Sequence, residues 1–304
     1  MKSERLVVAS GFILISLIWG STWLAIKIGL ESVPPFFGVA LRFTVAMIIL
    51  AIIQWIRGHR LPSNRKSILC YLTVGVLSFS FPFALVYWGE QYVPSGLTAI
   101  LFAVNPFIVA LGSHLYLPGE RSNVFKFGGI VVGFAGIGYI FWNDLSLDVA
   151  GVRGMGAILI STIMQGISLV TVKRIAQHLS PAELSLGGML FGVPLLYILA
   201  FAFELPSSIN LDLKGAGSIL YLGLFGTVIT FLTYYWLLKR VEAVYLSLVA
   251  FVTPVLAVIL GSVVLNERLE SHVFSGAGLV LAGIVIVNSK DLYLALMDRK
   301  KRMR

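Results

Sequence analysis

The 304-residue chain is 58% hydrophobic and 12% charged, with a formal net charge of +9 and a mean hydropathy of +0.93. Soluble domains carry about a quarter charged residues, so this composition excludes an ordinary soluble domain. The positive charges lie in short clusters between apolar blocks, which favours a lipid bilayer over nucleic acid as their partner. The single cysteine, Cys70, excludes an internal disulfide and a cysteine metal cluster.

The apolar blocks are each roughly 18 to 23 residues long, the length that a helix needs to cross the hydrocarbon core. Lipid supplies no hydrogen bonds to a backbone, so each block should be helical. The first block is too long for a signal peptide and has no A-x-A-like cleavage site, so it should be retained as a helix. We predict an all-α polytopic membrane protein with ten transmembrane helices, near residues 7–27, 34–56, 68–88, 95–117, 124–142, 154–173, 182–203, 215–238, 243–264 and 272–288.

The charges between these helices predict the orientation. With ten helices, both termini share a side with the loops that follow the second, fourth, sixth and eighth helices. That side carries most of the Lys and Arg residues, and the other side carries most of the acidic residues, including Asp144, Asp148, Glu204 and Asp212. Because an excess of Lys and Arg marks the cytoplasmic side, we expect both termini in the cytoplasm.

The two halves of the chain are similar in sequence. WGSTWLAIKIGLESVPP, from Trp19, aligns with QGISLVTVKRIAQHLSP, from Gln165, at a shift of 146 residues. At nearly the same shift, three further segments align in the same order: Asn105-Pro106 with Thr253-Pro254, GERS from Gly119 with NERL from Asn266, and VVGFAGI from Val131 with LVLAGIV from Leu279. Self-similarity at a fixed shift indicates an internal repeat.

Each repeat, 6–142 and 151–288, contains five predicted helices. Because five is odd, the second repeat enters the membrane from the opposite side. Inverted repeats are typical of secondary transporters, whose substrate site lies between the repeats near the membrane midplane. Residues 289–304 form a basic tail that we expect on the cytoplasmic side, against anionic lipid headgroups.

These features resemble one family. The two five-helix halves, the WG pair at Trp19, the prolines of the fourth and ninth helices, and the GER and NER motifs that follow them resemble the ten-helix EamA type of the drug/metabolite transporter superfamily. The resemblance implies two inverted bundles around a central cavity, alternating access and no cofactor. It also implies a prokaryotic inner membrane with cytoplasmic termini, and export of amino acids or other small metabolites.

Polar and aromatic side chains near mid-membrane are the candidates for a substrate site, because such groups are costly in lipid unless they are paired or hydrated. Ser16, Gly20, Trp23 and Lys27 share one helix face, and Ser161, Gln165 and Ser168 share another. The alternative is that these residues pack helices together or bond to their own helix. The predicted substrate-binding residues are Trp19, Ser21, Thr22, Trp23, Ser78, Pro82, Asn105, Gln165, Ser168, Thr227, Thr230 and Thr253.

Two charged residues are candidate contacts. Arg42 is the only Lys or Arg well inside a predicted helix, where it could hold a substrate carboxylate, pair with Glu31 or Glu90, or snorkel to the interface. Glu90 could contact substrate or carry a proton, or simply be solvated at the outer end of the third helix. Lys27 and Lys173 are typical of snorkelling residues at helix ends.

Proline and glycine suggest where helices bend and touch. Pro106 and Pro254 each remove a backbone donor and disturb the carbonyl four residues earlier, at Phe102 and Ala250, so both are candidate hinges. The alternative is a purely structural bend. Gly129, Gly133 and Gly278 permit close helix contact, which could hold the two halves together or form a homodimer.

The leading function is a secondary transporter of small organic metabolites, with amino acids as the first substrate class and export as the direction. No P-loop motif is present, so a nucleotide energy source is not indicated, and proton coupling and facilitated exchange stay open. A multidrug or other metabolite carrier is an alternative, as is a channel or a non-transporting membrane partner. An enzyme is not expected, because no HExxH or GxSxG motif is present.

Overall fold

The computed structural model describes residues 2–117, 124–144, 149–247, 249–283 and 285–286, and these residues form helices and short connections without any strand. The predicted tail, 289–304, lies outside the described residues. The helices are α1 (Lys2–Gly29), α2 (Pro35–Ile56), α3 (Arg65–Val74), α4 (Phe81–Glu90), α5 (Ser95–Phe102), α6 (Asn105–Tyr116), α7 (Val124–Asp144), α8 (Val149–Ile175), α9 (Pro181–Phe203), α10 (Leu213–Gly223), α11 (Thr230–Leu238), α12 (Ala243–Ser247) and α13 (Val249–Leu265).

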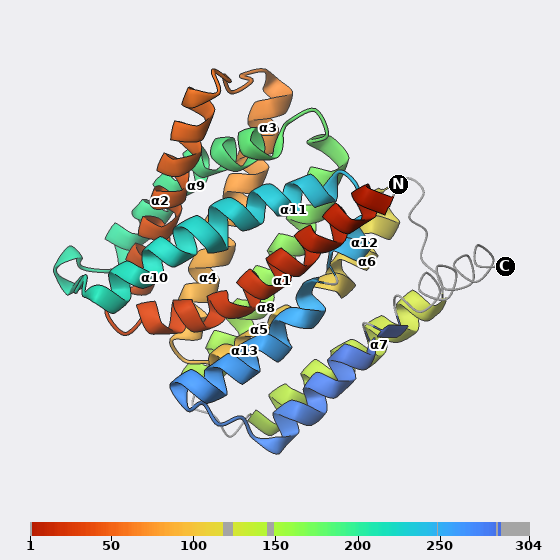
Figure 1. Ribbon diagram of the computed structural model, residues 1–304. Coiled ribbons are helices and arrows are strands. Elements are labelled where there is room, and N and C mark those ends of the chain that lie inside the picture. The colour runs from red at the N-terminus through yellow and green to blue at the C-terminus, as the bar shows by residue number, and fades with distance from the viewer. Residues whose placement is uncertain (1, 118–123, 145–148, 248, 284, 287–304) are drawn as a thin grey trace.

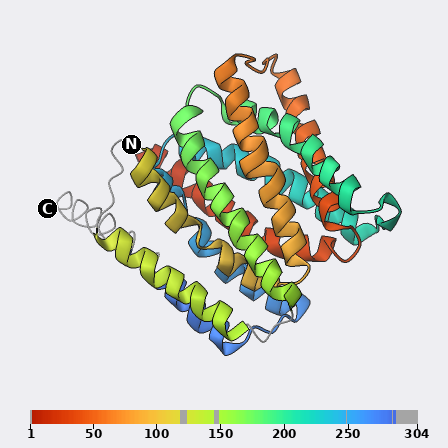
Figure 2. The ribbon, with the colours of Figure 1, turned by 180° about the vertical axis from the view of Figure 1, so that it is seen from behind.

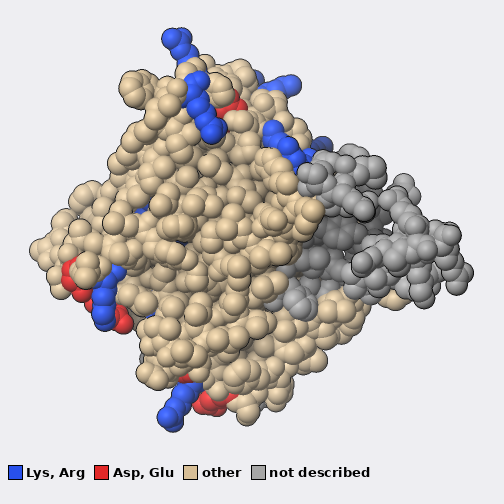
Figure 3. Space-filling view, in the orientation of Figure 1, with Lys and Arg blue, Asp and Glu red and all other residues tan. Residues whose placement is uncertain are grey.

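Within the described residues, seven helical stretches are long and apolar enough to span a membrane, and shorter apolar helices cover Gly128–Ile140, Val252–Leu265 and Ser271–Gly283. Together they coincide with the ten predicted helices, so the all-α polytopic fold is confirmed. Figure 3 shows charged side chains gathered near the edges of the visible face, with a broad uncharged surface between them.

Several of the predicted helices are built from more than one segment. In the third, a π-helical turn at Gly75–Ser80 joins α3 to α4, and in the eighth a π-helical turn at Leu224–Ile229 joins α10 to α11. The fourth helix breaks between α5 and α6, directly before Pro106. Pro254 lies inside α13. The π turns occupy nearly matched positions in the two repeats, and such turns are frequent at functional sites.

The two repeats exchange their first helices. α1 packs against α10, α11 and α13 of the second repeat, and α8 packs against α4, α5 and α6 of the first. Figure 1 shows α1 beside α11 and α13, and Figure 2 shows α8 between the third and fourth helices on the opposite side. The helices around the centre of the molecule therefore come from both repeats.

The helix Ser271–Gly283 runs beside α7 at the edge of the molecule (Figures 1 and 2). Their backbones touch at glycines: a Cβ atom added to Gly136 would lie 2.6 Å from the carbonyl oxygen of Gly276. Gly129 and Gly133 lie against Gly283 in the same way. These two predicted dimer glycines therefore make contacts within one chain, whereas Gly278 faces open space.

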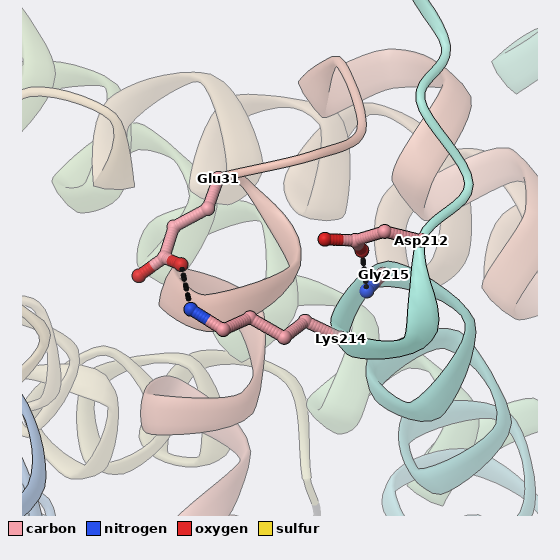
Figure 4. A network of polar contacts seen from close by, with 4 residues as sticks. All are labelled: Glu31, Asp212, Lys214 and Gly215. Atoms are coloured by element: carbon pink, nitrogen blue, oxygen red, sulfur yellow. Dashed lines mark hydrogen bonds and ion pairs between the residues drawn. The ribbon is translucent and has the colours of Figure 1, made fainter.

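We name the two ends of the bundle after the predicted orientation. The inner end holds the N-terminal residues of α1 and the connections 57–64, 176–180 and 239–242, and the outer end holds the connections 30–34, 91–94 and 204–212. At the outer end, Lys214 forms a 2.8 Å ion pair with Glu31 (Figure 4). The Asp212 carboxylate accepts a 2.7 Å bond from the Gly215 N–H and so caps α10.

Candidate functional site

A cavity of about 90 Å³ lies between the two repeats. By the measure used for buried water, this is room for several water molecules or a small solute. Many of the predicted residues line it, contributed by both repeats: Trp19, Thr22, Trp23, Arg42, Ser78, Asn105, Gln165, Ser168 and Thr253. The inverted repeats thus bring together residues that are up to 234 positions apart in the chain (253 minus 19).

The other predicted residues lie elsewhere. Ser21 bonds with the Tyr221 hydroxyl at 2.6 Å, and Thr227 lies behind Arg42. Neither belongs to the cavity wall. The remaining ones are buried outside that wall: Pro82, Glu90, Pro106, Thr230 and Pro254.

Much of the apolar wall was not among the predicted site residues. The additional lining residues are Ile26, Phe83, Val86, Phe102, Leu169, Val172, Phe231, Tyr234, Tyr235, Leu246, Ser247, Val249 and Ala250. A signal for some of them existed. The aromatic run SFSFPFALVYWGE contains Phe83 and Val86, and the carbonyls freed by Pro106 and Pro254 belong to Phe102 and Ala250.

Aromatic rings of the cavity wall contact one another, both between the repeats and within the first repeat. The Trp19 ring lies 5.0 Å from that of Tyr234 and 5.7 Å from that of Phe231. The Trp23 ring lies 5.3 Å from that of Phe102. Rings at these separations attract each other beyond their area burial. The two tryptophans of WGSTWLAIK therefore contribute to an aromatic wall.

Hydroxyl and amide groups form a polar part of the same wall. The Ser78 and Ser168 hydroxyls are 2.7 Å apart, which links the π-helical turn of the third helix to α8. The Asn105 amide donates to the Thr162 carbonyl at 3.3 Å. Gln165 lies one turn before Ser168 on α8 and also lines the cavity. These groups suit hydrogen bonding to a polar solute.

Arg42 is fully enclosed, with 1% of its surface exposed, so it does not snorkel. Its Nε donates to Thr227 Oγ1 at 2.9 Å, and its Nη2 donates to the Gly226 carbonyl at 3.0 Å. Its guanidinium carbon lies 4.8 Å from the centre of the Phe83 ring. The π-helical turn Leu224–Ile229 thus supplies two of the oxygen partners of this cation, and the Tyr87 hydroxyl, 3.5 Å from Nη1, is a third.

Neither acidic candidate pairs with Arg42 through a hydrogen bond. Glu31 pairs with Lys214 instead. Glu90 is completely buried, and its two carboxylate oxygens have no hydrogen-bond partner among the described residues. The interpretation of Glu90 as a residue solvated at the outer end was therefore wrong.

Lys27 and Lys173 form matched contacts at opposite ends of the bundle. Lys27 Nζ donates to the carbonyls of Glu90, at 2.5 Å, and Val93, at 3.1 Å, in the outer turn after α4. Lys173 Nζ donates at 2.6 Å to both the Leu238 and Val241 carbonyls, in the inner turn after α11. The interpretation of both lysines as snorkelling residues was wrong, because carbonyls that a helix end leaves unpaired lie within their reach.

Glu267, from the NER motif, caps the outer half of the fourth helix. It accepts bonds of 2.9 Å from both the N–H and the hydroxyl of Ser95, and one of 3.3 Å from the Gly96 N–H. A carboxylate at a helix N-terminus satisfies free donors and opposes the helix dipole favourably. The NER motif therefore ties the connection after α13 to α5.

Comparison with known proteins identifies the family of the chain. The model of the EamA-like transporter family matches residues 7–142 and 152–289. An uncharacterized transporter of Bacillus subtilis, YoaV, is 30% identical over 90% of this chain and 94% of its own length. An uncharacterized inner membrane transporter of Escherichia coli, YedA, is 31% identical over 89% of this chain and 87% of its own.

One more relative and one solved structure are also similar to this chain. The protein PagO of Salmonella typhimurium is 29% identical over 86% of each chain. A crystal structure with 20% sequence identity superimposes with a TM-score of 0.69, over 94% of this chain and 97% of that one, and so supports the fold. Because the family model covers nearly the whole chain in two consecutive matches, the protein belongs to the EamA-like transporter family.

Proposed function

We propose that this membrane transporter carries small organic metabolites, amino acids first among them, out of the cytoplasm by alternating access. The observation that carries the proposal is the cavity between the repeats, to which Trp19, Thr22 and Ser78 contribute from the first repeat and Gln165, Ser168 and Thr253 from the second. Both a polar and an aromatic part of its wall are available to a small solute. The export direction rests on the resemblance to the family's exporters.

The matched lysine contacts support alternating access. Lys27 belongs to α1, which packs with second-repeat helices, and it bonds to the turn between α4 and α5 of the first. Lys173 belongs to α8, which packs with first-repeat helices, and it bonds to the turn between α11 and α12 of the second. Opening the outer end would break the first contact, and opening the inner end would break the second. Each repeat thus supplies one of two equivalent closures.

Such paired closures favour a carrier over a channel, because a channel requires a path that is continuous from one side to the other. Pro106 and Pro254 stay our proposed hinges. The carbonyls that they leave unpaired, at Phe102 and Ala250, belong to residues of the cavity wall. Bending at these prolines would therefore reshape the cavity directly.

Counterflow in proteoliposomes tests the proposal. Purified protein is reconstituted with an unlabelled amino acid inside, and uptake of labelled amino acids is measured for wild type, Trp19→Ala and Gln165→Ala. We expect saturable exchange of one amino-acid group, reduced roughly five- to thirtyfold in both variants, since each removes a direct contact worth about 1–2 kcal/mol. Trp55→Ala and Gln177→Ala, on the exposed surface, are the matched controls.

Exchange that survives both cavity variants would place the substrate site elsewhere. Uptake that does not saturate and needs no internal substrate would indicate a channel. Exchange of other metabolites but of no amino acid would retain the carrier and reject the substrate class.

A further inference from the structure

Within the described residues, Arg42 is the only charged side chain on the cavity wall. A guanidinium has five N–H donors and no acceptor. Three contacts are formed, to Thr227, to Gly226 and, at 3.5 Å, to the Tyr87 hydroxyl, and all three partners are uncharged. Some N–H donors of Arg42 therefore have no acceptor among these contacts, and they lie beside the cavity.

A second donor on the same wall lacks an acceptor. The indole N–H of Trp23 is buried, and no described residue accepts a hydrogen bond from it. Trp23 and Arg42 both line the cavity. Buried polar groups are nearly always satisfied in proteins. The unpaired indole N–H of Trp23, together with the N–H donors of Arg42 beyond its three contacts, therefore points to a ligand that supplies the acceptor.

The positive charge of Arg42 indicates which kind of acceptor the ligand supplies. A buried cation is unfavourable unless an anion compensates it. The buried Glu90 carboxylate lies within electrostatic range of two cations, Lys27 and Arg42, and hydrogen-bonds to neither, so one carboxylate faces two positive charges. Glu31 pairs with Lys214 at the surface. A carboxylate suits the planar fork of an arginine, which can bind both of its oxygens.

The rest of the wall indicates the chemical character of the other part of the ligand. Phe83 lies under the guanidinium, and Trp19, Phe231 and Tyr234 form the aromatic wall. We propose that the cavity selects organic carboxylates with an apolar, preferably aromatic, portion, and that Arg42 binds their carboxylate group. This inference rests on the proposed function, whose solute it restricts by charge.

Ligand binding to purified protein tests the inference with matched probes. The fluorescence of the cavity tryptophans is titrated at neutral pH with 3-phenylpropionate, with its neutral amide 3-phenylpropionamide, and with the cation 2-phenethylamine. We expect the carboxylate to bind at least tenfold more tightly than the amide, which has the same shape without the charge, and the amine to bind weakest. Equal affinity for the amide or the amine would overturn the inference.

Variants test the role of Arg42 itself. Arg42→Lys keeps the charge but loses the fork, so carboxylate affinity should fall roughly tenfold. Arg42→Gln should abolish the preference for the carboxylate over the amide, and Arg153→Gln, at an exposed position, should leave it unchanged. A preference that persists in Arg42→Gln would overturn the inference. If that variant does not fold, the three probes on wild type still decide.

Counterflow separates this inference from the proposed function. Carboxylate binding without counterflow would reject transport and retain the anion site. Counterflow of amines or neutral solutes that is insensitive to Arg42→Lys would retain transport and reject the anion site.

Discussion

Asp212 is a surface carboxylate that caps the N-terminus of α10. Its bond from the Gly215 N–H is the main reason why its pKa lies below the usual value for aspartate, and a bond from Ser32 and the nearby Lys214 act in the same direction. Glu204 shows the opposite balance. It accepts 2.8 Å bonds from the N–H groups of Phe36 and Phe37, yet burial outweighs them and raises its pKa.

A lowered pKa in the folded state means that the ionised form of Asp212 stabilises the fold. This contribution is present above the unfolded pKa of about 4 and is lost as the pH falls through the folded value. We expect thermal unfolding of wild type to lose more stability below about pH 4 than unfolding of Asp212→Asn, whose amide caps a helix without titrating. Parallel pH profiles for the two proteins would contradict this assignment.

At the residue scale, the sequence reveals which side chains are costly in lipid but not what satisfies them. Arg42 and Gln165 stand out because charged and amide groups rarely occur inside an apolar block. Two of the partners of Arg42 lie 184 and 185 positions away, on a π-helical turn that has no recognisable sequence pattern. Lys27 was misread for the same reason, since its carbonyl partners depend on packing across the bundle.

At the scale of elements, helix positions follow from apolar length, and the break before Pro106 follows from the missing N–H of proline. The π-helical turns do not follow from the sequence. Gly75–Ser80 is followed by Pro82, which cannot donate to the Ser78 carbonyl, whereas Leu224–Ile229 has no such proline. Their shared position reflects the tertiary arrangement of the two repeats rather than a local signal.

Removing Lys27 and removing Lys173 should open opposite ends of the cavity. Each ammonium bond to a carbonyl contributes about 1.5–3 kcal/mol, so removing one lysine should shift the balance of open states about tenfold or more. In a Cys70→Ser background with Thr253→Cys as the reporter, Lys27→Met should increase labelling by a membrane-impermeant maleimide from the outer side. Lys173→Met should increase it from the inner side.

The control for this experiment is Lys66→Met, which removes an exposed lysine from the inner end. Increased labelling from the same side in both variants, or no change in either, would reject the role of the lysines as closures.

At the scale of the whole molecule, α7 and the helix Ser271–Gly283 form a pair at the edge, held by backbone contact between glycines. The sequence left open whether its glycines pack within the chain or between two chains. Sequence spacing cannot distinguish these cases, because a small residue permits close approach by any helix. In the fold, Gly129 and Gly133 lie against Gly283 of the same chain.

Two glycines on one helix provide a matched test of this packing. Gly136→Leu must push the carbonyl of Gly276 away, whereas Gly138, on another face of α7, has no atom within 4 Å of an added Cβ. We expect Gly136→Leu to reduce the free energy of unfolding by about 1–3 kcal/mol, as overpacking does, and Gly138→Leu to have little effect. Thermal unfolding in detergent measures both, and equal losses would contradict the glycine contact.

The exchange of α1 and α8 between the repeats has a consequence for biogenesis. The nascent chain inserts α1 first, yet the helices against which it packs include α13, which ends at Leu265. The first repeat therefore leaves the translocon without its final neighbours, and its own core stays open for α8 to enter. Assembly must wait for most of the second repeat, so two halves expressed as separate polypeptides should be degraded singly and rescue each other when they are synthesised together.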